Sequence, residues 1–287
     1  MLIWIISITL ILCGIAAGLI GALLGLGGAT ILIPILVIYG IPINYASGVG
    51  LFSALATSCT ACSRLMRRSL VNQRLAIELS AASTLGAIMG SISCYYVLSH
   101  GLEYILHIAL SAVMFSSIYL VNSRSSASLV QSLSSRLTSM GIMLMGGLLS
   151  GLLGIGGGPI NLVALYWSLG LSLSAATATS NFIVGVTAAT SGSLYWVFGY
   201  VQPFIAFLAV LGTVMGAQAG ASLLPKVRGS TLKAILISVF AYLATRMLIS
   251  GLRLGGVLPI SQSYEYVISA IAAVAFVAAM LALGKIK

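Results

Sequence analysis

The feature that most constrains this chain is a series of uninterrupted apolar runs, most of them close to the ~20 residues that a helix needs to cross a membrane. They recur from one end of the sequence to the other, at 3–24, 44–63, 75–98, 104–121, 138–153, 172–196, 203–224, 232–250 and 264–284. The runs are continuous instead of alternating between apolar and polar residues, so they predict helices and not the strands of a membrane β-barrel. The expected fold class is therefore an all-α polytopic membrane protein.

Composition excludes other classes of protein. Of the 287 residues, 60% are hydrophobic and only 6% are charged, whereas a soluble domain carries roughly a quarter charged residues. The net charge of +10 is carried by short loops between the apolar runs, where an orientation signal is expected, so nucleic acid is excluded as a partner. The first run lacks the basic n-region of a signal peptide, and we expect it to stay in the mature protein.

The four cysteines predict neither a metal site nor a disulfide framework. Cys59 and Cys62 have the spacing of a redox motif, but they lie in an apolar run with no histidine or third cysteine nearby. We expect them to pack as small apolar residues. An intramembrane thiol enzyme would also need clustered acids, bases or metal ligands. The sequence therefore predicts no enzyme, no cofactor and no metal.

Two glycine clusters indicate an internal duplication. Residues 25–35 read GLGGATILIPI, and 129 positions later residues 154–164 read GIGGGPINLVA. Further matches pair SGVGLF at 47–52 with TATSNF at 177–182, and the glycines of GAIMG with those of GTVMG. Such duplications are common in transporters. The predicted organisation is a first transmembrane repeat at 1–121, a Ser/Arg-rich linker at 122–137, a second repeat at 138–251, and a C-terminal transmembrane helix within 252–287.

Loop charges predict that the two repeats are inverted. In the first half the loop at 64–74 is basic and the loop at 99–103 carries no Lys or Arg, whereas in the second half 197–203 is uncharged and 225–233 is basic. Because cytoplasmic loops collect Lys and Arg, equivalent loops should lie on opposite sides of the membrane. Parity then requires each glycine-broken run to form a re-entrant helix pair, with the N-terminus outside and the C-terminus inside. The run 3–24 is long enough to span, so a full crossing stays open as the alternative.

The glycine clusters predict an anion site. Glycine weakens a helix, and a broken helix at membrane depth survives only where protein or a wet cavity surrounds it. The helix that follows such a break presents unpaired N–H groups and the positive end of its dipole, which favour an anion. With inverted repeats the two breaks should meet near the midplane.

The candidate substrate-binding residues belong to the breaks and to the matching helices. Ser, Thr and Asn donate hydrogen bonds to oxyanions without the cost of an intramembrane charge, which suits a substrate that must also leave. The predicted set is Gly27, Gly28, Thr30, Ser47, Gly156, Gly157, Gly158, Asn161, Thr179, Ser180 and Asn181.

Other glycines and charges are assigned structural roles. Glycines spaced by four, as in Gly86 and Gly90, are expected to allow close helix packing. Arg246 lies near the end of a run, and its side chain is expected to reach the interface. The chain has no Asp, and its three Glu lie near the ends of runs. The sequence therefore leaves the coupling ion open, as a proton or sodium.

The same segments resemble the TauE/SafE sulfite-exporter family, over nearly the whole chain. The resemblance rests on GLGGATILIP and GIGGGPINL, on ASGVGLF and ATATSNF, and on GAIMG and GTVMGAQAG. It implies transport of sulfur-containing anions such as sulfite, sulfoacetate or other organosulfonates across the cytoplasmic membrane. By position it assigns motif roles to Gly27, Gly28, Gly156, Gly157, Asn161, Ser180 and Asn181. The first half departs from the family pattern at Gly50, which occupies the place of Ser180.

The leading hypothesis is a secondary transporter that exposes a midplane anion site alternately to the two sides of the membrane. The alternative is a passive anion channel with the same glycine-lined site. The expected partners are the sulfur-containing anion, the lipid bilayer, a coupling ion, and a second copy of the chain in a homodimer.

Overall fold

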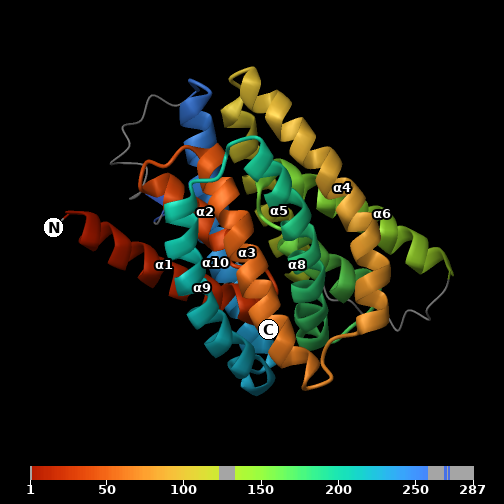
Figure 1. Cartoon of the computed structure of the whole chain (residues 1–287). Coiled ribbons are helices and arrows are strands. Elements are labelled where there is room, and N and C mark those ends of the chain that lie inside the picture. The colour runs from red at the N-terminus through yellow and green to blue at the C-terminus, as the bar shows by residue number, and fades with distance from the viewer. Residues whose placement is uncertain (1, 123–132, 258–267, 270, 272–287) are drawn as a thin grey trace.

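The computed structural model describes residues 2–122, 133–257, 268–269 and 271, and every regular element in these residues is helical (Figure 1). The predicted all-helical fold class is therefore confirmed. The first half contains α1 (Leu2–Leu24), α2 (Ala29–Ile38), α3 (Ile43–Met66), α4 (Gln73–Ser99) and α5 (Glu103–Asn122). The second half contains α6 (Leu133–Leu153), α7 (Gly158–Val163) with the π-helical turn η1 (Ala164–Ser168), α8 (Leu173–Val197), α9 (Pro203–Leu223) with the 3-10 turn η2 (Leu224–Lys226), and α10 (Gly229–Leu254).

The helices coincide with the predicted apolar runs to within a few residues. The largest difference is at α6, which begins at Leu133 and not at 138. The polar turn before the apolar run continues the same helical hydrogen bonding, which hydropathy alone does not reveal. Most of the run predicted at 264–284, except residues 268–269 and 271, and most of the predicted linker, 123–132, lie outside the described residues.

Five helical stretches in the described part of the chain are long and apolar enough to cross a membrane. They are Ser7–Leu24, Ile43–Met66, Gln73–Ser99, Pro203–Lys226 and Ile237–Leu254. Helix α8 is 25 residues long, but its Ser, Thr and Asn residues leave it too polar for this set. Its polar positions are mostly buried inside the bundle.

Two long helix pairs join the halves of the chain, α1 with α9 and α4 with α6. In both pairs glycines bring the backbones into direct contact, as their spacing predicts. A Cβ added at Gly86 or Gly90 would overlap the carbonyl oxygen of Leu144 or Leu148, and one added at Gly212 or Gly216 would overlap that of Ile11 or Ile15. Residue numbers rise together along each pair, so the helices of each pair are parallel.

Two pairs of helices that the predicted repeat makes equivalent, α3 with α8 and α5 with α10, run in opposite directions. Helices α3 and α8 pack together, with Ser58 beside Gly185 and Leu51 beside Gly192. Helices α5 and α10 also pack together: Ser111 Oγ donates to the carbonyl of Ala244 at 2.8 Å, and His107 lies beside Gly251. In both pairs residue numbers rise on one helix as they fall on the other, so both pairs are antiparallel.

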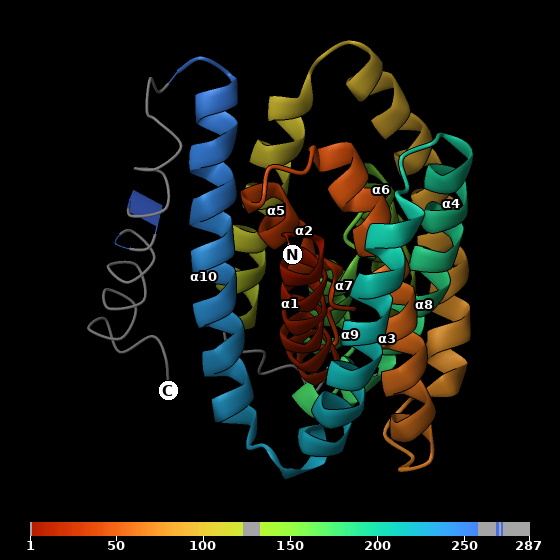
Figure 2. The ribbon, with the colours of Figure 1, turned by 60° about the vertical axis from the view of Figure 1, so that its left-hand side comes forward.

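The two basic connections lie at the same end of the bundle, which we call the basic end. It contains the α3–α4 connection (67–72) and the α9–α10 connection (224–228), whereas the α4–α5 and α8–α9 connections lie at the opposite end (Figure 2). Arg64 Nη1 links helices at the basic end by donating to the carbonyl of Gln218 at 3.1 Å. The exposed basic side chains here are Arg64, Arg67, Arg68, Arg74, Lys226 and Arg228.

Arg246 does not reach the surface as expected. Its side chain is only 3% exposed, and His107 on the facing helix α5 is 2% exposed. Packing of α10 against α5 buries both residues. The position of Arg246 near the end of an apolar run does not reveal this contact, because it does not show which helix lies opposite.

Candidate functional site

The two glycine clusters adopt the same backbone conformation. The first, third and fourth positions of each cluster have φ angles in the left-handed region, where a side chain costs roughly 1–2 kcal/mol. These angles are 72°, 72° and 69° at Gly25, Gly27 and Gly28, and 73°, 76° and 76° at Gly154, Gly156 and Gly157. Each cluster therefore ends one helix and begins the next, α1 to α2 and α6 to α7.

The two breaks meet at one place in the bundle. A Cβ added at Gly156 would lie 2.9 Å from Val184 Cγ1 and 3.4 Å from Ala54 Cβ. One added at Gly27 would collide with the same Val184 methyl and lie 3.2 Å from the same Ala54 Cβ. Ala54 and Val184 lie near the middle of α3 and α8. The breaks also touch each other, because Gly158 of the second cluster packs directly on the backbone of Leu26 in the first cluster.

Side chains from the opposite half cap the ends of the broken helices. A helix end inside a membrane protein leaves carbonyls that need donors, and three predicted site residues supply them from α3 and α8. Ser180 Oγ donates to Gly25 at 2.7 Å, Asn181 Nδ2 donates to Ala22 at 3.1 Å, and Ser47 Oγ donates to Leu153 at 3.1 Å. These donors hold the breaks in place.

Tyr195 has the same capping role and was missed by the sequence analysis. It is fully buried on α8, and its hydroxyl donates to the carbonyl of Gly151 at 2.9 Å, near the end of α6. A tyrosine in an apolar run carries no sequence signal for this contact.

The two predicted threonines are also engaged. Thr30 Oγ1 donates to the carbonyl of Leu26 at 3.3 Å, one turn earlier, as is common for Thr in helices. Thr179 Oγ1 accepts a hydrogen bond from the backbone N–H of Asn72 at 3.2 Å. This contact ties α8 to the α3–α4 connection at the basic end.

Other buried polar side chains around the breaks have no hydrogen-bond partner among the described residues. Neither side-chain atom of Asn161 is paired, and the same holds for the hydroxyls of Ser150, Thr57 and Ser58. Buried polar groups are nearly always paired, and an unpaired one costs about 1–3 kcal/mol. An unpaired cluster of this kind can therefore satisfy a ligand.

The unpaired groups lie directly against the glycines. Measured from the position that a Cβ would take at Gly157, Asn161 Nδ2 lies at 3.2 Å and Ser150 Cβ at 3.3 Å. Measured in the same way, Thr57 Oγ1 lies 2.9 Å from Gly28 and Ser58 Oγ 3.3 Å from Gly27. The unpaired groups of both halves therefore lie within contact distance of the glycine backbones, where a Cβ would crowd them.

The sequence analysis predicted Asn161 but missed Thr57, Ser58 and Ser150. Thr57 had a usable signal, because it aligns with Thr187 at the same offset of 130 positions that pairs Ser47 with Thr177. Ser58 aligns with Ala188 at this offset, and Ser150 aligns with Gly21 at the offset of 129 that pairs the glycine clusters. The repeat therefore offers no hint of either serine.

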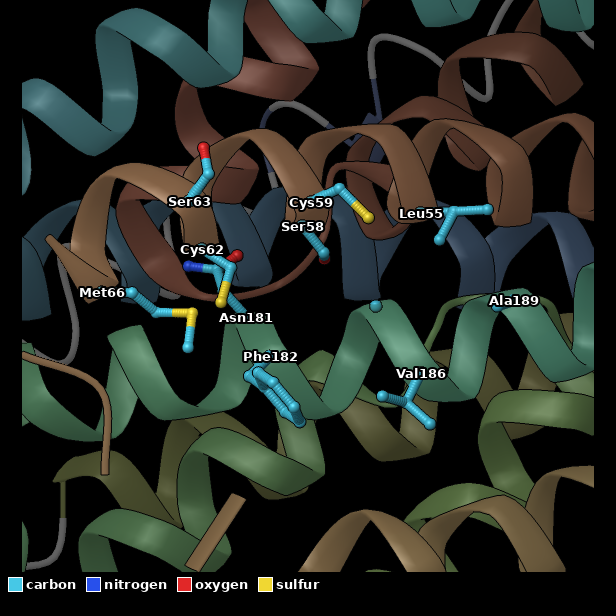
Figure 3. A pocket seen from close by; sticks show the side chains of 11 residues that line it. Leu55, Ser58, Cys59, Cys62, Ser63, Met66, Asn181, Phe182, Val186 and Ala189 are labelled. Atoms are coloured by element: carbon cyan, nitrogen blue, oxygen red, sulfur yellow. The ribbon is translucent and has the colours of Figure 1, made fainter. Parts of the chain in front are cut away.

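A cavity of about 440 Å³ opens between α3 and α8 and extends from the breaks toward the basic end (Figure 3). We call it the α3–α8 groove. Cys59 and Cys62 are both free thiols on its wall, and no group of three metal-ligating side chains occurs in the described part of the chain. The groove is lined by Leu55, Ser58, Cys59, Cys62, Ser63, Met66, Asn181, Phe182, Gly185, Val186 and Ala189.

Comparison with known families identifies the family of the chain. The family model described as "Sulfite exporter TauE/SafE" matches residues 10–247. The chain belongs to the TauE/SafE family. As a member it is a multi-pass membrane transporter and not an enzyme.

Curated relatives of this TauE/SafE protein are named as transporters. The probable membrane transporter protein YdhB of Bacillus subtilis is 28% identical over 78% of this chain and 92% of its own length. YjnA of the same organism is 25% identical over 86% of this chain and 99% of its own. MJ0441 of Methanocaldococcus jannaschii is 26% identical over 84% of this chain and 94% of its own. No solved structure matches the chain.

Proposed function

We propose that the protein is a secondary transporter of small sulfur-containing anions, such as sulfite, sulfoacetate or other organosulfonates. The observation that carries this proposal is the convergence of the two glycine breaks on Ala54 and Val184, surrounded by buried polar groups without partners. A buried polar site at the convergence of both halves is what a membrane transporter needs for one small polar substrate.

The chemistry of the site suits an anion that binds and leaves. Thr57, Ser58, Ser150 and Asn161 offer hydroxyl and amide donors, and α2 begins beside them at Ala29, so that its positive dipole end adds to the attraction. No Lys or Arg belongs to this cluster. Binding through neutral donors is weaker than binding by a fixed cation, and it therefore allows release.

The packing of the helices supports the predicted inverted repeats and alternating access. Equivalent helices are antiparallel in both pairs that touch, and the two basic connections share one end of the bundle. Parallel repeats would instead place equivalent helices in the same direction. The re-entrant arrangement stays a prediction: α1 and α6 each end in a break and continue as the short helices α2 and α7, but Ser7–Leu24 of α1 is also long enough to cross the membrane.

The substrate class follows the family's description, and the remaining partners stay predictions. The family is described by sulfite export, and we extend this to sulfoacetate and related organosulfonates for the present chain. Glu103 is the first residue of α5, and Glu78 is the sixth residue of α4, and neither belongs to the candidate site. A proton or sodium ion therefore remains the predicted coupling ion, and a homodimer the predicted assembly.

The first test is a thermal-shift screen of the purified protein against sulfite, sulfate, thiosulfate, sulfoacetate and taurine. A ligand at about 100 times its Kd stabilises the folded state by about 2.7 kcal/mol. We expect one sulfur anion to raise the melting temperature of the wild type and of Gly199→Leu, but not of Gly157→Leu.

Gly199 is a matched control for Gly157. Their φ angles are 75° and 76°, so both substitutions impose the same backbone strain, but nothing lies within 4 Å of a Cβ at Gly199. Equal stabilisation of both variants by the anion would contradict a site at the break.

Uptake into proteoliposomes separates the transporter from a passive channel. We expect the stabilising anion to accumulate above its external concentration when a proton or sodium gradient is imposed. Flux that only equilibrates the anion under both gradients would favour the channel.

A further inference from the structure

The α3–α8 groove has an equivalent on the other half of the chain that is closed. The repeat offset of 130 positions, which pairs Ser47 with Thr177, also pairs Met66 with Trp196 and Phe182 with Phe52. Met66 and Phe182 both line the open groove. Their equivalents Trp196 and Phe52 are in contact, with ring centroids 5.8 Å apart.

Backbone packing closes the equivalent position further. A Cβ added at Gly192 of α8 would lie 3.7 Å from Leu51 Cβ and 3.7 Å from the Phe52 ring. The equivalent of Gly192 in the first half is Cys62, which lines the open groove. Helices α3 and α8 are therefore in close contact toward the end opposite the basic end, and they diverge toward the basic end.

The inner end of the open groove reaches the first glycine break. Ser58 and Asn181 line the groove and are fully buried. Ser58 Oγ and Asn181 Oδ1 have no hydrogen-bond partner in the described structure. Asn181 also holds the end of α1 through Ala22. The groove thus leads from the basic end to two residues whose unpaired oxygens lie buried behind its inner wall.

We propose that the α3–α8 groove is the basic-end half of the route by which the anion reaches the breaks, and that Phe52 and Trp196 close the other half. In the opposite state Phe52 and Trp196 separate, and Met66 packs on Phe182. This inference rests on the proposed transport function. When a transporter with inverted halves changes from one access state to the other, each half takes up the conformation that the other half had. The open groove and its closed equivalent are then the same α3–α8 contact in its open and closed conformations.

Basic side chains lie at the same end of the bundle as the outer end of the groove. Arg64 and Arg67 are exposed on α3 and just after it, on either side of Met66 in the sequence. A cluster of one sign of charge at a mouth raises the local concentration of the opposite ion.

The two native thiols allow a direct test of access. The test protein keeps Cys59 and carries Cys13→Ala, Cys62→Ala and Cys94→Ala; a matched protein keeps only Cys94, which is 2% exposed beside Tyr195. Both are treated in membrane vesicles of either orientation with a membrane-impermeant, negatively charged methanethiosulfonate, and labelling is read by intact mass. We expect Cys59 to react from the basic end only and Cys94 from neither side.

A cross-link tests the closed half. In a cysteine-free background, Phe52→Cys with Trp196→Cys should be joined by a short bifunctional thiol reagent in the absence of substrate, and transport should stop until the link is reduced. Each single-cysteine variant, whatever its own transport rate, should transport at the same rate before and after this treatment. Met66→Cys with Phe182→Cys should be joined more slowly, because these positions meet only in the opposite state.

Two results would overturn the proposal: no reaction of Cys59 from the basic end, or normal transport by the 52–196 cross-linked protein. Failure of this proposal can be distinguished from failure of the proposed function. Labelling by mass needs no substrate, so a labelled groove with no transported sulfur anion would contradict the substrate class alone.

Discussion

At the scale of single residues, the buried hydroxyls around the breaks fall into two kinds. Ser180 and Ser58 are both fully buried on facing helices. Ser180 donates to Gly25 at 2.7 Å, whereas Ser58 has no partner in the described part of the chain. A paired hydroxyl stabilises the fold, and an unpaired one weakens it until a ligand arrives.

This difference predicts opposite effects for the same substitution. Ser180→Ala should lower the free energy of unfolding by about 1 kcal/mol, because it leaves a buried carbonyl without its donor. Ser58→Ala should leave the melting temperature unchanged or raise it, and should weaken stabilisation by sulfite or sulfoacetate several-fold. Melting curves with and without each anion measure both quantities. A lower melting temperature for Ser58→Ala would show that its hydroxyl is paired.

The sequence could locate the breaks but could not sort these side chains. A glycine cluster carries its own conformational signal, so the positions of Gly27 and Gly156 were predictable. A buried Ser or Thr can bond its own helix, as Thr30 does, or another helix, as Ser47 does. Which of these happens depends on neighbours brought together only by the fold.

At the scale of helices, close packing rests on glycines that meet a backbone. The carbonyl oxygen of Ile15 on α1 fills the space where a Cβ of Gly216 on α9 would lie. Apolar runs predicted the helices well because length and hydropathy are local properties. The pairing of α1 with α9 and of α4 with α6 was not predicted, since spaced glycines mark a contact face without naming the partner helix.

Alanine substitution at two helical glycines tests this packing. Gly216→Ala should lower the melting temperature and the yield of folded protein, because α1 must move away from α9. Gly141→Ala should be neutral or stabilising by up to about 1 kcal/mol through helix propensity, since nothing lies within 4 Å of a Cβ there. Detergent-solubilised protein can be compared by size-exclusion chromatography and thermal melting. Equal stability of the two variants would contradict the packing argument.

At the scale of the whole molecule, the distribution of charge defines an orientation. The exposed basic residues of the α3–α4 and α9–α10 connections share one end of the bundle, and cytoplasmic loops collect such residues. We therefore expect the basic end to face the cytoplasm. The opposite end carries an aromatic cluster in which Tyr95 and Phe198 have ring centroids 5.0 Å apart.

Cysteine labelling in intact cells tests this orientation. In a cysteine-free background, Tyr200→Cys should react with an impermeant maleimide from outside, and Arg228→Cys should react only after the membrane is opened. Arg228 is exposed at the basic end, and Tyr200 lies in the α8–α9 connection at the opposite end. The reverse pattern would end the orientation proposed here.

The capping of each broken helix by the other half has a consequence for biosynthesis. When the first half leaves the ribosome, the carbonyls of Ala22 and Gly25 have no donors, because Asn181 and Ser180 are not yet made. The glycine face of α4 likewise has no packing partner until α6 has been made. The first half should therefore remain open to chaperones and proteases during translation, and stable folding should begin only once α8 has been inserted.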